Sequence, residues 1–111
     1  MTLPNAENAQ IPDNKITKYL LDFENPQNKG KALFYEKIGY SLENFEILRI
    51  DLQKLVKTGE VKEILPNIEG TKYVVVGTIN APNGKTYELK TIWIIEQKHE
   101  FPRLVSAYPN K

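Results

Sequence analysis

The strongest constraint on the fold comes from two β-branched segments, residues 71–80 and 86–95, which the short connection 81–85 separates. In this connection Pro82 fixes its φ angle at about −65°, and Gly84 can adopt the left-handed conformation that closes a three-residue loop. Such a loop pairs Ala81 with Lys85. The two segments are therefore expected to form the central strands of an antiparallel sheet.

The pairing of Ala81 with Lys85 also assigns the side chains of the hairpin to two faces, because side chains alternate along a strand. The core face is expected to hold the cross-strand pairs Ile79 with Tyr87, Gly77 with Leu89, Val75 with Thr91, and Tyr73 with Trp93. The opposite face is polar near the turn and apolar only at its far end. A two-residue turn at Asn83 and Gly84 would shift the pairing by one residue and bring charge beside apolar groups, so the three-residue loop is favoured.

Composition limits the chemistry that the chain can carry. With 111 residues it is long enough for one domain with a substantial core. Cysteine is absent and His99 is the single histidine, which leaves no basis for a disulfide, a thiolate metal site or a cysteine nucleophile. No metal or other cofactor is therefore expected. His99 lies in a polar connection, where it is either a solvated side chain or a general base.

Charge and hydropathy restrict the partners. The 15 Lys and Arg residues against 14 Asp and Glu residues give a formal net charge of +1, so any site for a polyanion has to be a local patch. No apolar run approaches the roughly 20 residues that a membrane-spanning helix needs. The first residues also lack the basic and then apolar layout of a signal peptide. These features predict a cytoplasmic protein without a membrane partner.

The remainder of the chain predicts helices before the hairpin and one further strand on each side of it. Residues 1–12 are polar and aperiodic and are expected to be a flexible arm, followed by a single α+β domain over residues 13–109. Helices are predicted at residues 14–22 (after an N-cap at Asp13), 31–38 and 42–58, and strands at 60–65, 71–80, 86–95 and 101–108. Because no strand–helix–strand crossover occurs, the sheet should be four-stranded and antiparallel, with the three N-terminal helices packed on one face.

Apolar spacing predicts the inward faces of these elements. In the second helix the inward residues are expected to be Leu33, Phe34 and Ile38. In the third helix the expected buried stripe, widened by two isoleucines, is Phe45, Ile47, Leu48, Ile50, Leu52, Leu55 and Val56. In the last strand, simple alternation groups Leu104, Ser106 and Tyr108 on one face and Arg103, Val105 and Ala107 on the other.

Basic side chains gather in the first two predicted helices, at Lys15, Lys18, Lys29, Lys31 and Lys37. Lys31 stands at a predicted helix start, where free backbone N–H groups and a cation suit a phosphate. Lys15 and Lys18 are further phosphate-binding candidates. The alternative interpretation is that these lysines are ordinary solvated surface, since Glu24 and Glu36 lie near them in the sequence.

Polar residues of the last two predicted strands form a second group of candidates. Two of the three residues Arg103, Ser106 and Tyr108 can point into a cleft, or all three can serve the fold. In the latter case Tyr108 packs at the end of the sheet and Arg103 pairs with a carboxylate of a neighbouring strand, Glu60 or Glu63. Thr91 falls on the core face, where its hydroxyl has to find a partner or line a cavity.

Two stretches of the sequence carry a family resemblance. The first runs through Lys15–Leu21, Asn25–Pro26, Gly30–Tyr35 and Ile38–Tyr40, and the second through Thr91–Ile94 and Pro102–Pro109. Together they resemble an uncharacterised bacterial family that occurs as small stand-alone proteins and as C-terminal modules of secreted polymorphic toxins. The ending Ser106–Pro109 and the order of helices before four strands are also similar to the barnase, EndoU, colicin and RelE group of nucleases.

The nuclease resemblance implies metal-independent RNA cleavage, in which a 2′-hydroxyl attacks the adjacent phosphate. Such a reaction needs a base, a cation for the developing charge, and an acid for the leaving oxygen. The implied roles are phosphate stabilisation by Lys31 and Arg103, hydrogen bonds from Thr91 and Ser106, and proton transfer or stacking by Tyr108. RNA is then the expected partner.

Two other classes of function stay open at this stage. The first is a non-enzymatic interaction protein, such as an immunity or antitoxin-like partner with a cognate protein. An exposed apolar patch around Tyr40, Phe101 and Tyr108 would favour this class. The second is a small-molecule binding module, for which a closed apolar pocket near Trp93 is expected.

Overall fold

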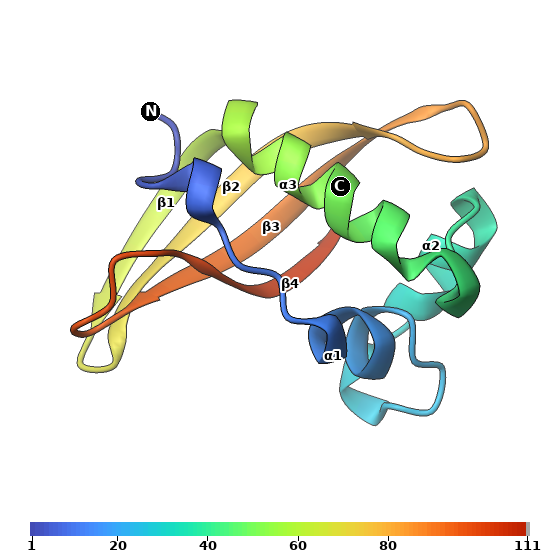
Figure 1. The fold of residues 1–111 in the computed structure, drawn as a ribbon, viewed down its shortest axis with the longest axis horizontal. Coiled ribbons are helices and arrows are strands. Elements are labelled where there is room, and N and C mark those ends of the chain that lie inside the picture. Colours follow the sequence, from blue (N-terminus) through green and yellow to red (C-terminus); the bar gives the residue numbers. More distant parts are fainter. Residues whose placement is uncertain (111) are drawn as a thin grey trace.

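The structure is a computed structural model that describes residues 1–110, and its architecture is α+β, as predicted. The helices are α1 (Asp13–Lys15, continued by a π-helical segment, Ile16–Leu20), α2 (Lys31–Ile38) and α3 (Phe45–Thr58). The strands are β1 (Glu60–Asn67), β2 (Gly70–Asn80), β3 (Thr86–Glu96) and β4 (Arg103–Pro109), and they form one antiparallel sheet in the order β1-β2-β3-β4. Figure 1 shows α3 lying across this sheet.

The register of the central hairpin is confirmed residue by residue. Gly84 has φ 85°, its N–H donates to the Ala81 oxygen at 2.9 Å, and the Ala81 N–H donates to the Lys85 oxygen at 2.9 Å. Val75 pairs with Thr91, and Tyr73 pairs with Trp93. The turn chemistry and the alternation of β-branched residues agree, so a single register satisfies both.

The main core lies between α3 and the predicted core face of the sheet. The residues of α3 that are buried there are Leu48, Leu52, Leu55 and Val56, and they face the buried Val75, Leu89 and Trp93. Gly77 permits this close approach, because a Cβ atom at that position would lie 2.9 Å from the Leu55 Cγ. The missing side chain on β2 thus allows the helix to pack directly onto the strand.

Two predicted helix faces are wrong in part. In α2 the buried residues are Ala32, Tyr35 and Ile38, whereas Leu33 is exposed and Phe34 only half-buried. Tyr35 turns inward because its hydroxyl donates to the Ala107 oxygen of β4 at 2.6 Å, which satisfies the polar atom of a fully buried side chain. In α3, Ile47 and Ile50 are exposed, because the helix contacts the sheet along one narrow stripe.

The N-terminal residues are packed, in contrast to the flexible arm expected from the sequence. Leu3, Ala6, Ala9 and Ile11 are buried in the main core. The Gln10 N–H donates to the Pro102 oxygen at 2.8 Å, and its oxygen accepts from the Leu104 N–H at 2.9 Å. The segment therefore covers the first half of the outer edge of β4, whose backbone groups would otherwise lack partners.

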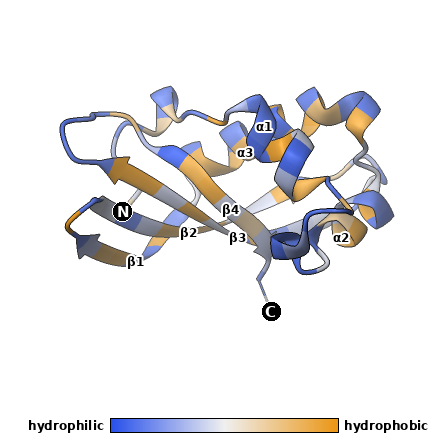
Figure 2. Cartoon of the chain, turned by 90° about the horizontal axis from the view of Figure 1, so that it is seen from below, coloured by the Kyte–Doolittle hydropathy of each residue, from blue (hydrophilic) through white to orange (hydrophobic). Residues whose placement is uncertain are grey.

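A β-bulge in β4 overturns the predicted alternation of that strand. Trp93 pairs with Leu104 but Ile92 pairs with Ser106, so Val105 is the additional residue. Beyond the bulge, Ala107 joins Leu104 in the core, and Ser106 and Tyr108 share the opposite face with Arg103. Seen edge-on in Figure 2, α1 and α3 lie on the same side of the sheet. None of the helices within residues 1–110 has the length and apolar character needed to cross a membrane.

Candidate functional site

An open groove of about 520 Å³ lies where the first helical region meets β4. The residues that line it are Pro12, Asn14, Lys15, Lys18, Tyr19, Ile94, Arg103, Leu104 and Val105. We call it the β4-edge groove. It brings together three of the cations that the sequence singled out, two from the helical region and one from the strand, so its rim is positively charged.

Tyr19 lines this groove and also contacts two side chains outside its lining, Lys31 and Ser106. Lys31 in turn contacts Tyr108. We call these four residues the Tyr19 cluster: Tyr19, Lys31, Ser106 and Tyr108. The Tyr19 hydroxyl and the Ser106 Oγ lie 3.1 Å apart and share a hydrogen bond. The Lys31 Nζ lies 5.5 Å from the centre of the Tyr19 ring and 5.3 Å from that of Tyr108. One ammonium group is therefore held between two phenol rings of different elements.

Asn28 explains how the sequence builds this cluster. Its side chain is buried, its amide N–H donates to the Leu20 oxygen at 3.1 Å, and its Oδ1 accepts from the Ala32 N–H at 2.9 Å. The Asn28 backbone oxygen accepts from the Lys31 Nζ at 3.2 Å. A single asparagine thus ties the π-helical segment to the start of α2 and fixes the positions of Tyr19 and Lys31 relative to each other.

The electrostatic environment changes the acidity of Tyr19. Burial raises the pKa of the phenol, but the hydrogen bond to Ser106 and the positive charges of Lys31 and Lys15 outweigh burial and hold the pKa below its ordinary value of 10.0. The Lys15 Nζ lies 5.1 Å from the centre of the Tyr19 ring. A larger fraction of Tyr19 is consequently deprotonated at a given pH below 10 than of a free tyrosine.

Arg103 reaches the groove with its charge partly compensated. Its Nη2 lies 2.6 Å from the Glu96 Oε1 of β3, and both side chains are more than one third exposed. The sequence suggested Glu60 or Glu63 as the partner of Arg103. These residues belong to β1, which is the edge strand at the opposite end of the sheet from β4. An exposed ion pair of this kind contributes about 0–1 kcal/mol to stability. Arg103 can therefore leave Glu96 and bind another anion with little loss of free energy.

Thr91 does not lie with the other predicted site residues. It is fully buried, its Oγ1 donates to the Val75 oxygen at 2.8 Å, and it accepts from the Trp93 Nε1 at 2.8 Å. Its hydroxyl therefore finds its partners inside the core. His99 is exposed in the connection before β4 and is not among the residues that line the groove.

Replacement of Thr91 by valine is expected to lower the free energy of unfolding by about 1–3 kcal/mol, because it leaves the Trp93 N–H buried without an acceptor. The measurement is chemical denaturation. The control is Thr91→Ser, which keeps the hydroxyl and should lose less stability. Equal losses in the two variants would contradict this role of the hydroxyl.

Two residues of the candidate site, Tyr19 and Lys90, are not indicated by any pattern in the sequence. Tyr19 recurs at helical spacing with Ile16 and Leu20, a pattern that is typical of the buried face of a helix and does not indicate a site. Lys90 stood in the middle of a strand with no neighbouring motif, yet it pairs with Tyr108 across the sheet. Across residues 1–110, no group of three or more His, Cys, Asp or Glu side chains is arranged to hold a metal ion.

The fold of this chain has a counterpart among solved structures. A solved chain from a contact-dependent growth inhibition toxin and immunity protein complex of Klebsiella pneumoniae 342 superimposes with a TM-score of 0.72. The likeness covers 90% of this chain and 98% of the other at 12% sequence identity, so it shows a shared fold. The chain itself belongs to the DUF6883 family, a domain of unknown function, whose profile matches residues 2–111. No curated protein matches the sequence.

Proposed function

We propose that this protein is a toxin-type domain that cleaves RNA without a metal ion. The observation that carries the proposal is the Tyr19 cluster, in which a tyrosine of lowered pKa, an ammonium group and a second phenol meet beside a cationic groove. Attack of a 2′-hydroxyl on the neighbouring phosphate requires a base, a cation and an acid. The three groups of the cluster supply them in that order.

In this reaction each group of the cluster has a separate role. The Tyr19 oxygen takes the proton of the 2′-hydroxyl, and the 2′-oxygen forms a bond to phosphorus. The Lys31 ammonium stabilises the charge that develops on the phosphate oxygens. The bond from phosphorus to the 5′-oxygen then breaks, and Tyr108 gives this oxygen its proton. The products end in a 2′,3′-cyclic phosphate and a 5′-hydroxyl, and Ser106 keeps Tyr19 oriented through their hydrogen bond.

The remaining cations suit the phosphates on either side of the one that is cleaved. Lys15, Lys18 and Arg103 line the β4-edge groove. Lys90 pairs with Tyr108 on the same face of the sheet. Such a row binds the phosphate backbone without reading sequence, so we expect binding to weaken as salt increases.

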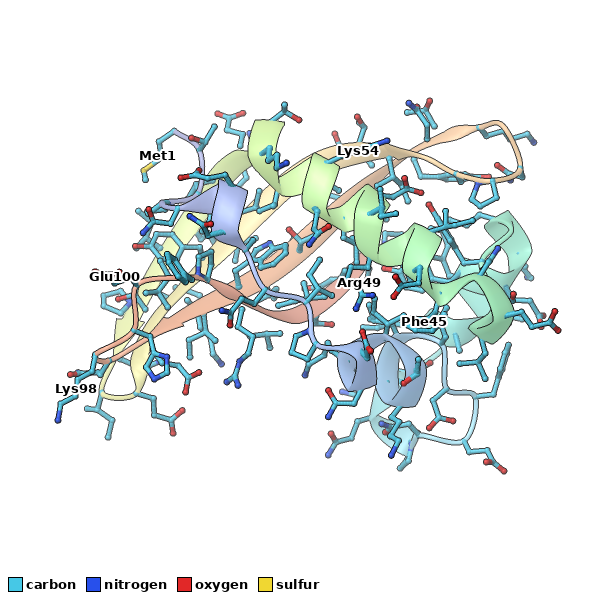
Figure 3. The ribbon with its side chains drawn as sticks, viewed as in Figure 1. Met1, Phe45, Arg49, Lys54, Lys98 and Glu100 are labelled. Carbon is cyan, nitrogen blue, oxygen red and sulfur yellow. The ribbon has the colours of Figure 1, made fainter. Side chains whose placement is uncertain are left out.

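The test is cleavage of labelled total RNA and tRNA in the presence of EDTA. Wild-type protein is expected to release fragments with cyclic phosphate ends, and Lys31→Ala is expected to be about 10²-fold slower or worse, as for the loss of a group that stabilises developing charge. The matched control is Lys54→Ala, since Lys54 is an exposed lysine on α3 (Figure 3). Equal cleavage by wild type and Lys31→Ala would contradict the assignment.

A second candidate function is that of a protein partner in a toxin and immunity pair. The observation in its favour is the fold shared with a chain of such a complex, which fits either member of the pair. The exposed apolar patch that the sequence suggested for such a partner included Tyr40, but Tyr40 is buried. The small-molecule alternative expects a closed apolar pocket near Trp93, but neither the β4-edge groove nor the smaller pocket beside α2 is lined by this residue.

A further inference from the structure

A second pocket, of about 210 Å³, lies on another side of α2 from the Tyr19 cluster. Its apolar wall includes Leu21, Phe23, Tyr40 and Leu42, and its rim carries the carboxylates of Glu36 and Glu43. We call it the α2 pocket. The residues of α2 thus divide between two sites: Lys31 belongs to the Tyr19 cluster, whereas Ala32 and Glu36 line the α2 pocket.

The apolar wall of the α2 pocket is open to solvent. The exposed fractions of Phe23 and Leu42 are 60% and 55%, which is high for two large apolar side chains that border the same hollow. Leaving them in water forgoes the free energy that their burial would provide, about 1.5–3 kcal/mol for each side chain. A partner that covers both would gain this free energy.

The floor and the rim of the α2 pocket are already held in place. The Tyr40 side chain is buried, and its hydroxyl donates to the Asp51 Oδ2 at 2.5 Å. The Ser41 N–H donates to the Asn44 Oδ1 at 2.7 Å, and the Asn44 amide donates to the Gly39 oxygen at 3.2 Å. A partner would therefore meet a preformed pocket and lose little free energy in ordering it.

Charge decides what kind of partner fits. The lining residues of the α2 pocket include two carboxylates and no lysine or arginine. Phosphate groups would be repelled there, so the occupant is not the RNA proposed for the β4-edge groove. A segment that carries a cation beside an apolar side chain fits better. The carboxylates of the rim would attract the cation, and the apolar side chain would cover the apolar wall.

We propose that the α2 pocket is a docking site for a protein segment in which a Leu, Phe or Met side chain is flanked by Lys or Arg. The apolar side chain enters between Phe23 and Leu42, and the basic side chain pairs with Glu36 and Glu43. This inference goes beyond RNA cleavage and does not depend on it, because the two sites share no lining residue.

The test selects random peptides, displayed on phage, that bind the full-length protein. The expected result is enrichment of peptides with an apolar side chain next to Lys or Arg. Their affinity should fall about tenfold or more, equivalent to about 1.4 kcal/mol, in the Glu36→Lys/Glu43→Lys variant and in Leu42→Ala. Affinity should be unchanged in Lys54→Ala, and circular dichroism checks that each variant is folded.

Three results would overturn the proposal. The first is the absence of enriched peptides, or enrichment of acidic ones. The second is binding that neither the charge reversal nor Leu42→Ala weakens. The third is self-association, measured by analytical ultracentrifugation, that Leu42→Ala abolishes, because the occupant would then be a second copy of this chain.

Discussion

Replacement of Tyr19 by phenylalanine is expected to slow the proposed RNA cleavage by about 10²–10⁴-fold, the usual contribution of a general base. The variant removes the oxygen that contacts Ser106 and keeps the ring that packs beside Lys15 and Lys31. Because the pKa of Tyr19 lies below 10.0, the wild-type rate should rise with pH, and the midpoint of this rise should lie below pH 10. The measurement is the rate of cleavage of a labelled RNA across this pH range.

The matched control for this variant is Tyr73→Phe. Tyr73 is a half-buried tyrosine of β2 that pairs with Trp93 in the middle of the sheet and does not line the β4-edge groove. Its replacement should leave the rate and its pH dependence unchanged. If Tyr19→Phe keeps the wild-type rate and pH profile, Tyr19 is not the base.

The second large effect is expected on stability. Trp93→Ala should lower the free energy of unfolding by about 3–5 kcal/mol, because it removes the largest fully buried side chain from the centre of the core. Chemical denaturation followed by circular dichroism measures the change. Trp93→Phe, which keeps an aromatic ring, should lose less.

The control for the core is Ile68→Ala. Ile68 lies in the turn between β1 and β2 and is exposed, so its replacement should change stability by no more than about 0.5 kcal/mol. A loss below about 1 kcal/mol in Trp93→Ala would contradict the position of Trp93 in a close-packed core.

The central hairpin could be predicted from the sequence because two independent signals agree. The turn chemistry of Pro82 and Gly84 fixes the length of the loop, and the alternation of the flanking strands fixes which face is buried. The structure reproduces this register from Asn80 and Thr86 to Gly70 and Glu96. The four-stranded antiparallel sheet followed from the same pair of strands, since no crossover connection was present.

The faces of β4 could not be predicted, because nothing in the residues around Val105 indicates a bulge. An additional residue at that point exchanges the two faces of the strand beyond it. Alternation therefore placed Ala107 outside the core and grouped Ser106 with Leu104. The structure instead buries Leu104 and Ala107 together and presents Ser106 to Tyr19.

Part of the candidate site was visible in the sequence. Lys15, Lys18 and Arg103 do line one groove, and Lys31 does lie beside the Tyr108 ring. The link between the two groups is Tyr19, which depends on the buried Asn28 and on a π-helical segment, both of which are tertiary features. Thr91 had to be either a core or a site residue, and its two buried hydrogen bonds place it in the core.

The two sides of α2 give the protein two surfaces of opposite charge. The start of the helix contributes Lys31 to a cationic site, and its middle contributes Glu36 to an acidic and apolar pocket. RNA and a basic protein segment would therefore approach different sides of the same short helix. This arrangement allows a protein partner to bind while the proposed RNA site remains open.

The most direct test of the RNA site is an NMR titration of the isotope-labelled protein with a 2′-O-methylated RNA oligonucleotide, which lacks the attacking hydroxyl and so binds without being cleaved. The largest changes in amide chemical shift are expected at Tyr19, Lys31, Ser106 and Tyr108, and they should weaken as salt increases. Changes confined to another part of the molecule, such as the hairpin turn 81–85, or no changes at all, would contradict the proposed RNA site.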